Sequence, residues 1–205
     1  MSFIQCTADD FTAQLASASP VPGGGGASAL VGAVGAALAG MVGNLTTGKK
    51  KYAQYEQDIQ KILARAEEFR AALLGLIDAD AACFEPLSRA YSTPKDDPKY
   101  DDIMENALNL ACTAPMDIMR TAAGAIALHG ELLEKGSRLM LSDVGVGVLC
   151  CKTALMGASL NVFINIRTMK NEARAEALGR EAQELLDTYC AEADRIYSAV
   201  SEKLM

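Results

Sequence analysis

The chain of 205 residues is half hydrophobic, has 5% aromatic residues and no Trp, and carries a formal net charge of −7. This acidic balance argues against a nucleic-acid-binding function, because binding to phosphates needs a basic face. The length suits one helical domain over residues 1–205, and the dominance of Ala, Leu and Gly favours an all-α bundle over a sheet.

A short helix and a hinge are predicted at the start of the chain. Thr7 is followed by Asp9 and Asp10, a pattern typical of a helix N-cap with acidic residues in the first turn. We therefore expect a helix that ends at about Ser17. Residues 20–26 then supply two prolines and four consecutive glycines, which interrupt the chain.

The next predicted helix, from about Gly26 to Leu45, contains no charged residue. Its small residues recur every three or four positions, so one face lacks long side chains and neighbouring helices can approach closely. An uncharged segment of this length also fits a membrane span, but its Ala and Gly content and the lack of an aromatic belt favour a buried helix of a bundle. The small residues are Gly32, Gly35, Ala36, Ala39, Gly40 and Gly43.

A long amphipathic helix is predicted from about Tyr52 to Ala90. Asp80 occupies a core position of its apolar seam, three residues after Ile77 and four before Phe84. A carboxylate that faces the core must be hydrogen-bonded, paired or protonated. Desolvation also raises the pKa of such a group toward the range for acid–base catalysis at neutral pH. From the residues alone, a structural and a catalytic Asp80 are equally supported.

Three more helices complete the bundle of about six. The first runs from about Lys99 to His129, with a kink or break near Ala114 because Pro115 follows. A linker is predicted over residues 130–141, and Ser142 and Asp143 then cap an apolar helix that reaches Thr168. The last helix, from Glu172 to about Leu204, is charged and amphipathic and should lie at the periphery.

Further polar residues have two interpretations each. Asp143, in the first turn of its helix, is an ordinary capping residue or an anionic site residue. Asn161 and Asn165, one turn apart, either bridge helices or recognise a heterocycle. Lys49 and Lys50 either begin a solvated helix or hold ligand carboxylates as point charges.

No metal site is indicated, and we expect no cofactor. The six cysteines form no CxxC motif, and His129 is the only histidine, so zinc-ligand spacing is missing. We expect a structural role for His129, free thiols in a reducing cytoplasm, and no signal peptide, because the N-terminus lacks a positive segment. The cysteines are Cys6, Cys83, Cys112, Cys150, Cys151 and Cys190.

Several sequence blocks, in this order and over essentially the whole chain, resemble the cyclodeaminase/cyclohydrolase family of folate enzymes. The resemblance implies an all-α, usually dimeric fold and a tetrahydrofolate substrate that carries a one-carbon unit. Its catalytic aspartate corresponds to Asp80, and a second conserved block of the family corresponds to Asp143. The blocks are Pro20–Gly25, Thr47–Tyr52, Leu76–Phe84, Ser142–Val144 and Asn161–Asn165.

The resemblance favours a 5-formimidoyltetrahydrofolate cyclodeaminase, in which Asp80 relays a proton while ammonia leaves. A 5,10-methenyltetrahydrofolate cyclohydrolase is the alternative, and a non-catalytic helical assembly module is a further one. We expect a cytoplasmic homodimer that binds a small-molecule folate, possibly polyglutamated, and neither nucleic acid nor membrane. The expected catalytic residues are Asp80 and Asp143, and the expected substrate-binding residues are Gly23, Gly24, Gly25, Ser28, Lys49, Lys50, Asn161 and Asn165.

Overall fold

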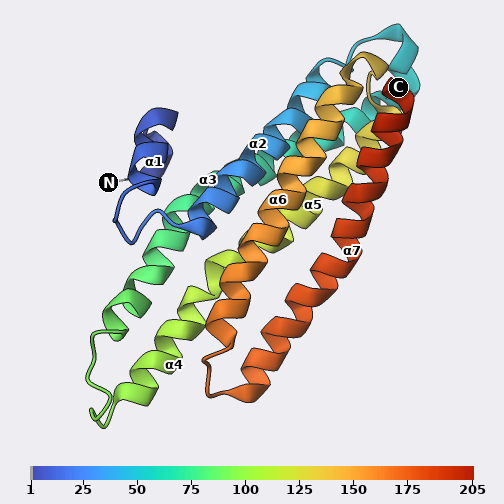
Figure 1. Cartoon of the computed structure of the whole chain (residues 1–205). Coiled ribbons are helices and arrows are strands. Elements are labelled where there is room, and N and C mark those ends of the chain that lie inside the picture. The colour runs from blue at the N-terminus through green and yellow to red at the C-terminus, as the bar shows by residue number, and fades with distance from the viewer. Residues whose placement is uncertain (1) are drawn as a thin grey trace.

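The computed structural model describes residues 2–205, and all of its regular structure is helical, with no strand in that range. Helices α2 to α7 lie alongside one another as an elongated bundle, while the short α1 projects beside the start of α2 (Figure 1). This confirms the all-α prediction. The α-helices are α1 (Ala8–Leu15), α2 (Gly24–Asn44), α3 (Glu56–Ala90), α4 (Tyr100–Ala111), α5 (Thr113–Lys135), α6 (Leu141–Ile166) and α7 (Glu172–Leu204). Short 3-10 helices span Phe3–Gln5, Lys50–Tyr55 and Arg138–Met140.

Helices α2 and α6 run antiparallel in close contact, because small residues line their interface. A Cβ on Gly32 would lie 3.0 Å from the Cβ of Ala154, and one on Gly35 would lie 2.5 Å from the Sγ of Cys151. A side chain at Gly35 would force the helices apart. The glycine spacing of the sequence therefore predicted a real close approach.

His129 of α5 is fully buried against this helix pair. Its Nε2 lies 3.1 Å from the carbonyl oxygen of Gly35, and a Cβ on Gly147 would lie 2.2 Å from the ring. Burial lowers the pKa of His129 to about 4. The ring is therefore neutral at physiological pH and fills the core, as the structural interpretation predicted.

The apolar seam predicted for α3 faces the core. Ile59, Ile62, Leu73 and Ile77 are fully buried, and Asp80 continues the same row in a half-buried position. The neighbouring acid Asp78 accepts hydrogen bonds from the N-terminal segment, from the hydroxyl of Ser2 and from the backbone N–H of Phe3 at 2.7 Å. The two aspartates therefore face different surroundings.

Some helix boundaries differ from the prediction. The break expected near Ala114 falls at Cys112, between α4 and α5. Helix α5 then continues to Lys135, so the linker predicted from residue 130 is wrong over its first six positions. The reason is that Leu132 and Leu133 are buried and continue the core-facing side of α5.

Two helical segments, Gly24–Asn44 and Arg138–Ile166, are long and apolar enough to cross a membrane. However, 56% and 44% of their apolar windows are buried inside the bundle, so their length and composition are weak evidence for a membrane span.

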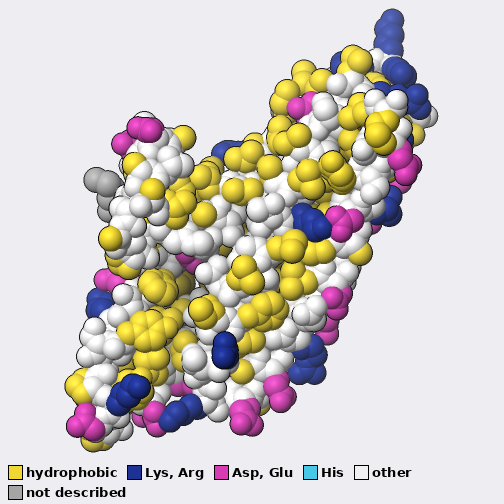
Figure 2. Space-filling model, viewed as in Figure 1, with side chains coloured by type: hydrophobic (Ala, Val, Ile, Leu, Met, Phe, Trp, Pro, Cys, Tyr) yellow, Lys and Arg dark blue, Asp and Glu magenta, His cyan; other side chains and the backbone are white. Residues whose placement is uncertain are grey.

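The other sides of these two segments form one exposed surface, which we call the apolar face. Figure 2 shows hydrophobic side chains gathered along it, over α2 and α6. Its large side chains are Val34, Met41, Leu45, Val146, Leu149, Met156, Leu160 and Ile164.

Candidate functional site

A cavity of about 250 Å³ lies where the first turn of α2 meets the last third of α3 and the second half of α6. It brings together three groups that the sequence had singled out: Gly23–Gly25, Asp80, and the pair Asn161 and Asn165. These groups are more than fifty residues apart in the chain, and only the packing of three helices makes them neighbours. Pro20, Val21, Phe84, Ala111, Pro115 and Ile164 complete the wall.

The Asp80 carboxylate rests against the backbone of α2 at Gly25. A Cβ on Gly25 would lie 2.2 Å from Oδ1, 2.5 Å from Cγ and 2.6 Å from Oδ2 of Asp80. Glycine is thus the only residue that leaves room for the carboxylate in this position. It also places the acid beside the N-terminus of a helix, where an anion is favoured.

Burial raises the pKa of Asp80 above its ordinary value, and the backbone of Gly26 in the first turn of α2 acts weakly in the opposite direction. No cationic side chain contributes to the shift. A carboxyl group in this environment exchanges a proton more readily near neutral pH than a solvated aspartate does. The site therefore contains a candidate general acid–base group.

The two asparagines on α6 differ in their surroundings. Asn161 faces Gly24, with its Nδ2 3.8 Å from the position of a Cβ there, and its Nδ2 donates to the Gly157 carbonyl at 3.1 Å. Asn165 is buried and donates to the Ala111 carbonyl at 3.3 Å, which ties α6 to the end of α4. Asn165 therefore bridges two helices while it also lines the cavity.

Ser28 lies outside the cavity, although the sequence placed it among the substrate-binding residues. Its hydroxyl donates to the Gly24 carbonyl at 2.7 Å within α2, and a Cβ on Gly157 of α6 would lie 2.4 Å from its Oγ. The side chain fills the contact between α2 and α6. Its position supports a structural role, since a one-turn hydrogen bond and a helix contact leave it little access to a ligand.

Asp143, Lys49 and Lys50 lie at the opposite end of the molecule. Asp143 precedes Asn161 by eighteen positions on one continuous helix, which at 1.5 Å per residue amounts to about 27 Å. The lysines follow the far end of α2, about 30 Å from Gly24 on the same measure. Within one chain, none of these three residues reaches Asp80.

The lysine end has a hollow of its own, of about 710 Å³, with three cations and one acid in its wall: Lys51, Arg138, Lys203 and Glu134. Tyr52 also lines it, and its hydroxyl accepts a hydrogen bond from the backbone N–H of Arg138 at 3.0 Å. This hydrogen bond lowers the pKa of Tyr52. The hollow is therefore suited to anionic groups.

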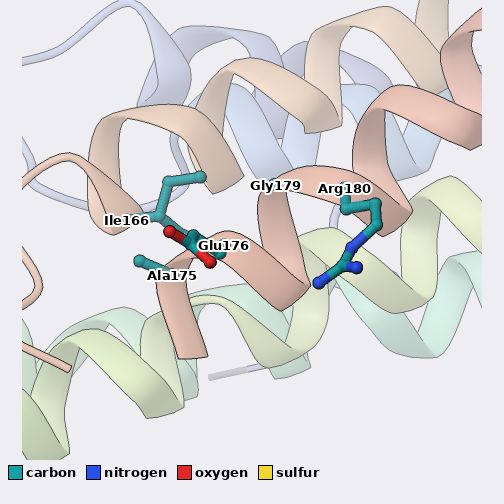
Figure 3. A pocket seen from close by; sticks show the side chains of 5 residues that line it. All are labelled: Ile166, Ala175, Glu176, Gly179 and Arg180. Atoms are coloured by element: carbon teal, nitrogen blue, oxygen red, sulfur yellow. The ribbon is translucent and has the colours of Figure 1, made fainter. Parts of the chain in front are cut away.

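A third hollow, of about 590 Å³, lies between the end of α6 and the first turns of α7. Figure 3 shows its wall, with Glu176, Gly179 and Arg180 on α7 and Ile166 on α6. None of the residues predicted to act in a site lies there. Within residues 2–205, no cluster of three or more His, Cys, Asp or Glu side chains could hold a metal ion. The Asp80 cavity is thus the best candidate site.

Comparisons with known proteins agree with this assignment. A family model described as formiminotransferase-cyclodeaminase matches residues 7–184. A methenyltetrahydrofolate cyclohydrolase from Methylorubrum extorquens is 39% identical over 202 residues, 97% of each chain. The formimidoyltransferase-cyclodeaminase of Rattus norvegicus is 29% identical over 90% of this chain, which spans about a third (35%) of that protein. The crystal structure of a formiminotetrahydrofolate cyclodeaminase from Thermotoga maritima superposes with a TM-score of 0.83 at 28% identity, over 97% of this chain and 95% of that one.

Proposed function

Because the chain belongs to the formiminotransferase-cyclodeaminase family, we propose that it is a folate one-carbon enzyme that acts on the N5–C–N10 bridge of tetrahydrofolate. The observation that carries the proposal is the Asp80 carboxylate, which is half-buried, has a raised pKa, and faces a cavity at the glycine-rich start of α2. A helical assembly module would have no use for such a group, since a buried carboxylate without a cation destabilises the fold.

The main activity in this proposal is the hydrolysis of 5,10-methenyltetrahydrofolate to 10-formyltetrahydrofolate. The cyclohydrolase of Methylorubrum extorquens supports this choice, because it matches the chain over almost its full length at the highest identity among the relatives compared above. Asp80 accepts a proton from water, and the oxygen bonds to the methenyl carbon. The carboxyl group then returns the proton to N5 as the C–N5 bond breaks. The second water proton leaves to solvent as the formyl C=O forms.

The second candidate is the cyclodeaminase reaction, which the Thermotoga maritima structure favours. N10 attacks the formimidoyl carbon held on N5, and the tetrahedral carbon expels ammonia to give the methenyl product. Asp80 carries the proton from N10 to the departing nitrogen. Both reactions pass through a tetrahedral carbon between two nitrogens, so one acid–base group serves either, and such a group typically contributes about 10²–10⁴-fold in rate.

The cavity accommodates only part of a folate. Its volume of about 250 Å³ is below the usual range for a drug-sized ligand, about 300–1,000 Å³. We therefore assign it to the pterin and the one-carbon bridge, with Phe84 and Pro115 against the rings and the Asn161 amide at their polar edge. The aminobenzoyl-glutamate tail extends outside, where Lys49 and Lys50 would hold its carboxylates.

The proposal includes a homodimer in the cytoplasm. The exposed apolar face supports the proposal of a homodimer, because a contiguous apolar surface along two helices commonly marks a protein interface. All six cysteines are free thiols, which suits a reducing compartment. The proton transfers described above require only the side chains of the protein, and Asp143 takes no part in them from its position within the same chain.

Ultraviolet spectroscopy tests the proposal, because methenyltetrahydrofolate absorbs in the near ultraviolet. Purified protein should remove this absorbance from 5,10-methenyltetrahydrofolate faster than the uncatalysed background, or generate it from 5-formimidoyltetrahydrofolate. Asp80→Asn should lower kcat by at least about 10²-fold while the binding of folate persists. Asp78→Asn, the same change two residues away, should retain turnover. Full activity in Asp80→Asn would remove this residue from the mechanism.

A further inference from the structure

The Asp80 cavity combines one acid with an otherwise uncharged wall. Among the described residues that line it, Asp80 alone has a charged side chain. The rest of the wall consists of apolar side chains, glycines and the neutral amides of Asn161 and Asn165. A guest that enters this cavity loses water and meets a single negative charge, so a flat guest with one positive charge fits it best.

The titratable groups on the neighbouring helices leave this charge in place. Cys83 lies one turn after Asp80 on α3, and burial, together with the nearby Asp80 charge, raises the pKa of its thiol. Asp117 of α5 adds a second acid near Cys83. Arg174 of α7 acts on Cys112, at the junction of α4 and α5, whereas it has no effect on Asp80.

The start of α2 is a positive pole beside the carboxylate. A helix N-terminus is equivalent to about half an elementary charge, and the backbone at Gly26 favours the charged form of Asp80. Burial nevertheless has the larger effect on the pKa of Asp80. The carboxylate is therefore only partly compensated by the protein, and a cation in the cavity would stabilise it further.

Both substrates of the proposed function carry such a charge at the reacting carbon. In 5,10-methenyltetrahydrofolate a positive charge is shared by N5, the methenyl carbon and N10. The formimidoyl group of 5-formimidoyltetrahydrofolate is an amidine, which is protonated at neutral pH. In both reactions the positive charge disappears when the carbon becomes tetrahedral and a proton has left the attacking group. The cavity thus holds a cation before the first step and a neutral adduct after it.

We propose that Asp80 is the counter-ion of the cationic one-carbon bridge, and that the loss of the bridge charge at the tetrahedral carbon converts Asp80 from a base into an acid. This inference rests on the proposed function. In the hydrolysis, an O–H bond of water breaks, the oxygen bonds to the methenyl carbon through its electron pair, and the proton goes to the carboxylate. One cation and one carboxylate thereby become two neutral groups.

The bridge charge acts on the affinity of Asp80 for a proton. An opposite charge within about 4–6 Å lowers the pKa of a carboxyl group by about 1–3 units, so the bound cation keeps Asp80 ionised and able to accept the proton. Once this charge has gone, burial again raises the pKa of Asp80, and the proton is held until the C–N5 bond breaks. By linkage, the cation binds the ionised cavity about 10–10³-fold more tightly than the protonated one. A neutral ligand lacks this gain.

Two unreactive tetrahydrofolates of the same shape test the charge preference. 5-Carbamimidoyltetrahydrofolate carries a guanidinium group at N5, and 5-carbamoyltetrahydrofolate carries a neutral urea group in the same place. In equilibrium dialysis at pH 7, the Kd of the wild type should be at least about tenfold lower for the guanidinium compound. In Asp80→Asn and in Asp80→Ala the two Kd values should become nearly equal.

Asp78→Asn is the matched control, because it removes an equal charge two residues away on α3 and should keep the wild-type ratio of the two Kd values. Equal Kd values in the wild type would overturn the proposal. A preference for the guanidinium compound that persists in both Asp80 variants would overturn it too, since the cation would then be recognised by another group.

Turnover separates this inference from the proposed function. A wild type that turns over neither folate refutes the proposed function. A wild type that turns over 5,10-methenyltetrahydrofolate but binds the guanidinium and urea compounds equally refutes the counter-ion role alone. Tighter binding of the urea compound would show that the positive pole of α2 dominates the cavity, and would refute the counter-ion role as well.

Discussion

Replacing Gly25 by alanine tests whether the position of the Asp80 carboxylate is essential for catalysis. The new Cβ would lie 2.2 Å from Oδ1 of Asp80, whereas ordinary contact begins near 3.4 Å. The carboxylate must therefore move by about 1 Å or rotate away from α2. Misplacement of a reacting group by about 1 Å costs on the order of 10²-fold in rate, so we expect kcat to fall by about that factor.

The fold should survive this substitution, because the displaced atoms belong to the end of a side chain. Alanine also favours a helix over glycine by about 0.5–1 kcal/mol, which offsets part of the strain. We expect the circular dichroism spectrum and the melting temperature to stay close to those of the wild type. A loss of activity would then reflect the geometry of the site.

Gly75→Ala is a matched control on α3, five residues before Asp80. Its virtual Cβ has no heavy atom within 4 Å, so the same chemical change should leave kcat unaltered. Both variants are compared by the initial rate of absorbance loss from 5,10-methenyltetrahydrofolate. If Gly25→Ala turned over at the wild-type rate, the placement of the carboxylate against α2 would have no catalytic importance, and the mechanism proposed for Asp80 would be refuted.

Four further predictions concern charge and burial. The pH profile of kcat should show an acid limb that inflects above the ordinary aspartate value of 3.8, because burial raises the pKa of Asp80, and no such limb should remain in Asp80→Asn. Because the pKa of Asp80 is raised in the folded protein, its contribution to stability is present at low pH and is lost as the pH rises through this pKa. At pH 7, calorimetry should therefore give a higher melting temperature for Asp80→Asn than for the wild type. Asn165→Leu leaves the Ala111 carbonyl without its donor and should lower the free energy of unfolding by about 1–3 kcal/mol in urea titrations. Burial lowers the pKa of His129 from 6.5 to about 4. Because one pKa unit corresponds to about 1.4 kcal/mol, the free energy of unfolding of the wild type should fall by about 3 kcal/mol between pH 7 and pH 4. The His129→Gln variant should not show this loss.

The amphipathic pattern was sufficient to predict the faces of the helices. The seam of α3 was read from apolar residues at spacings of three and four, and Ile62, Leu73 and Ile77 are buried as expected. The same pattern isolated Asp80, because a charged residue in a core row is an exception to the rule that forms the row. The glycines of α2 likewise identified a close helix contact, now seen at Gly35.

The direction in which helices pack could not be predicted in the same way. Periodicity shows which side of α6 is buried, but not which of its ends meets the glycine turn of α2. Because α6 runs antiparallel to α2, Asn161 reaches that turn and Asp143 lies about 27 Å away. Asn161 and Asp143 were both site candidates before the packing of the helices was known. Similarly, Ser28 was a site candidate through the family resemblance, whereas its partner Gly157 on α6 gives it a packing role.

The chemistry proposed for Asp80 depends on two opposing effects, of which burial is the larger. Burial disfavours the carboxylate and raises its pKa, while the backbone at Gly26 in the first turn of α2 favours the charged form. A lysine in the cavity would hold the acid ionised and unable to return its proton to N5. The separation of Asp80 from the lysine cluster is therefore an advantage for catalysis.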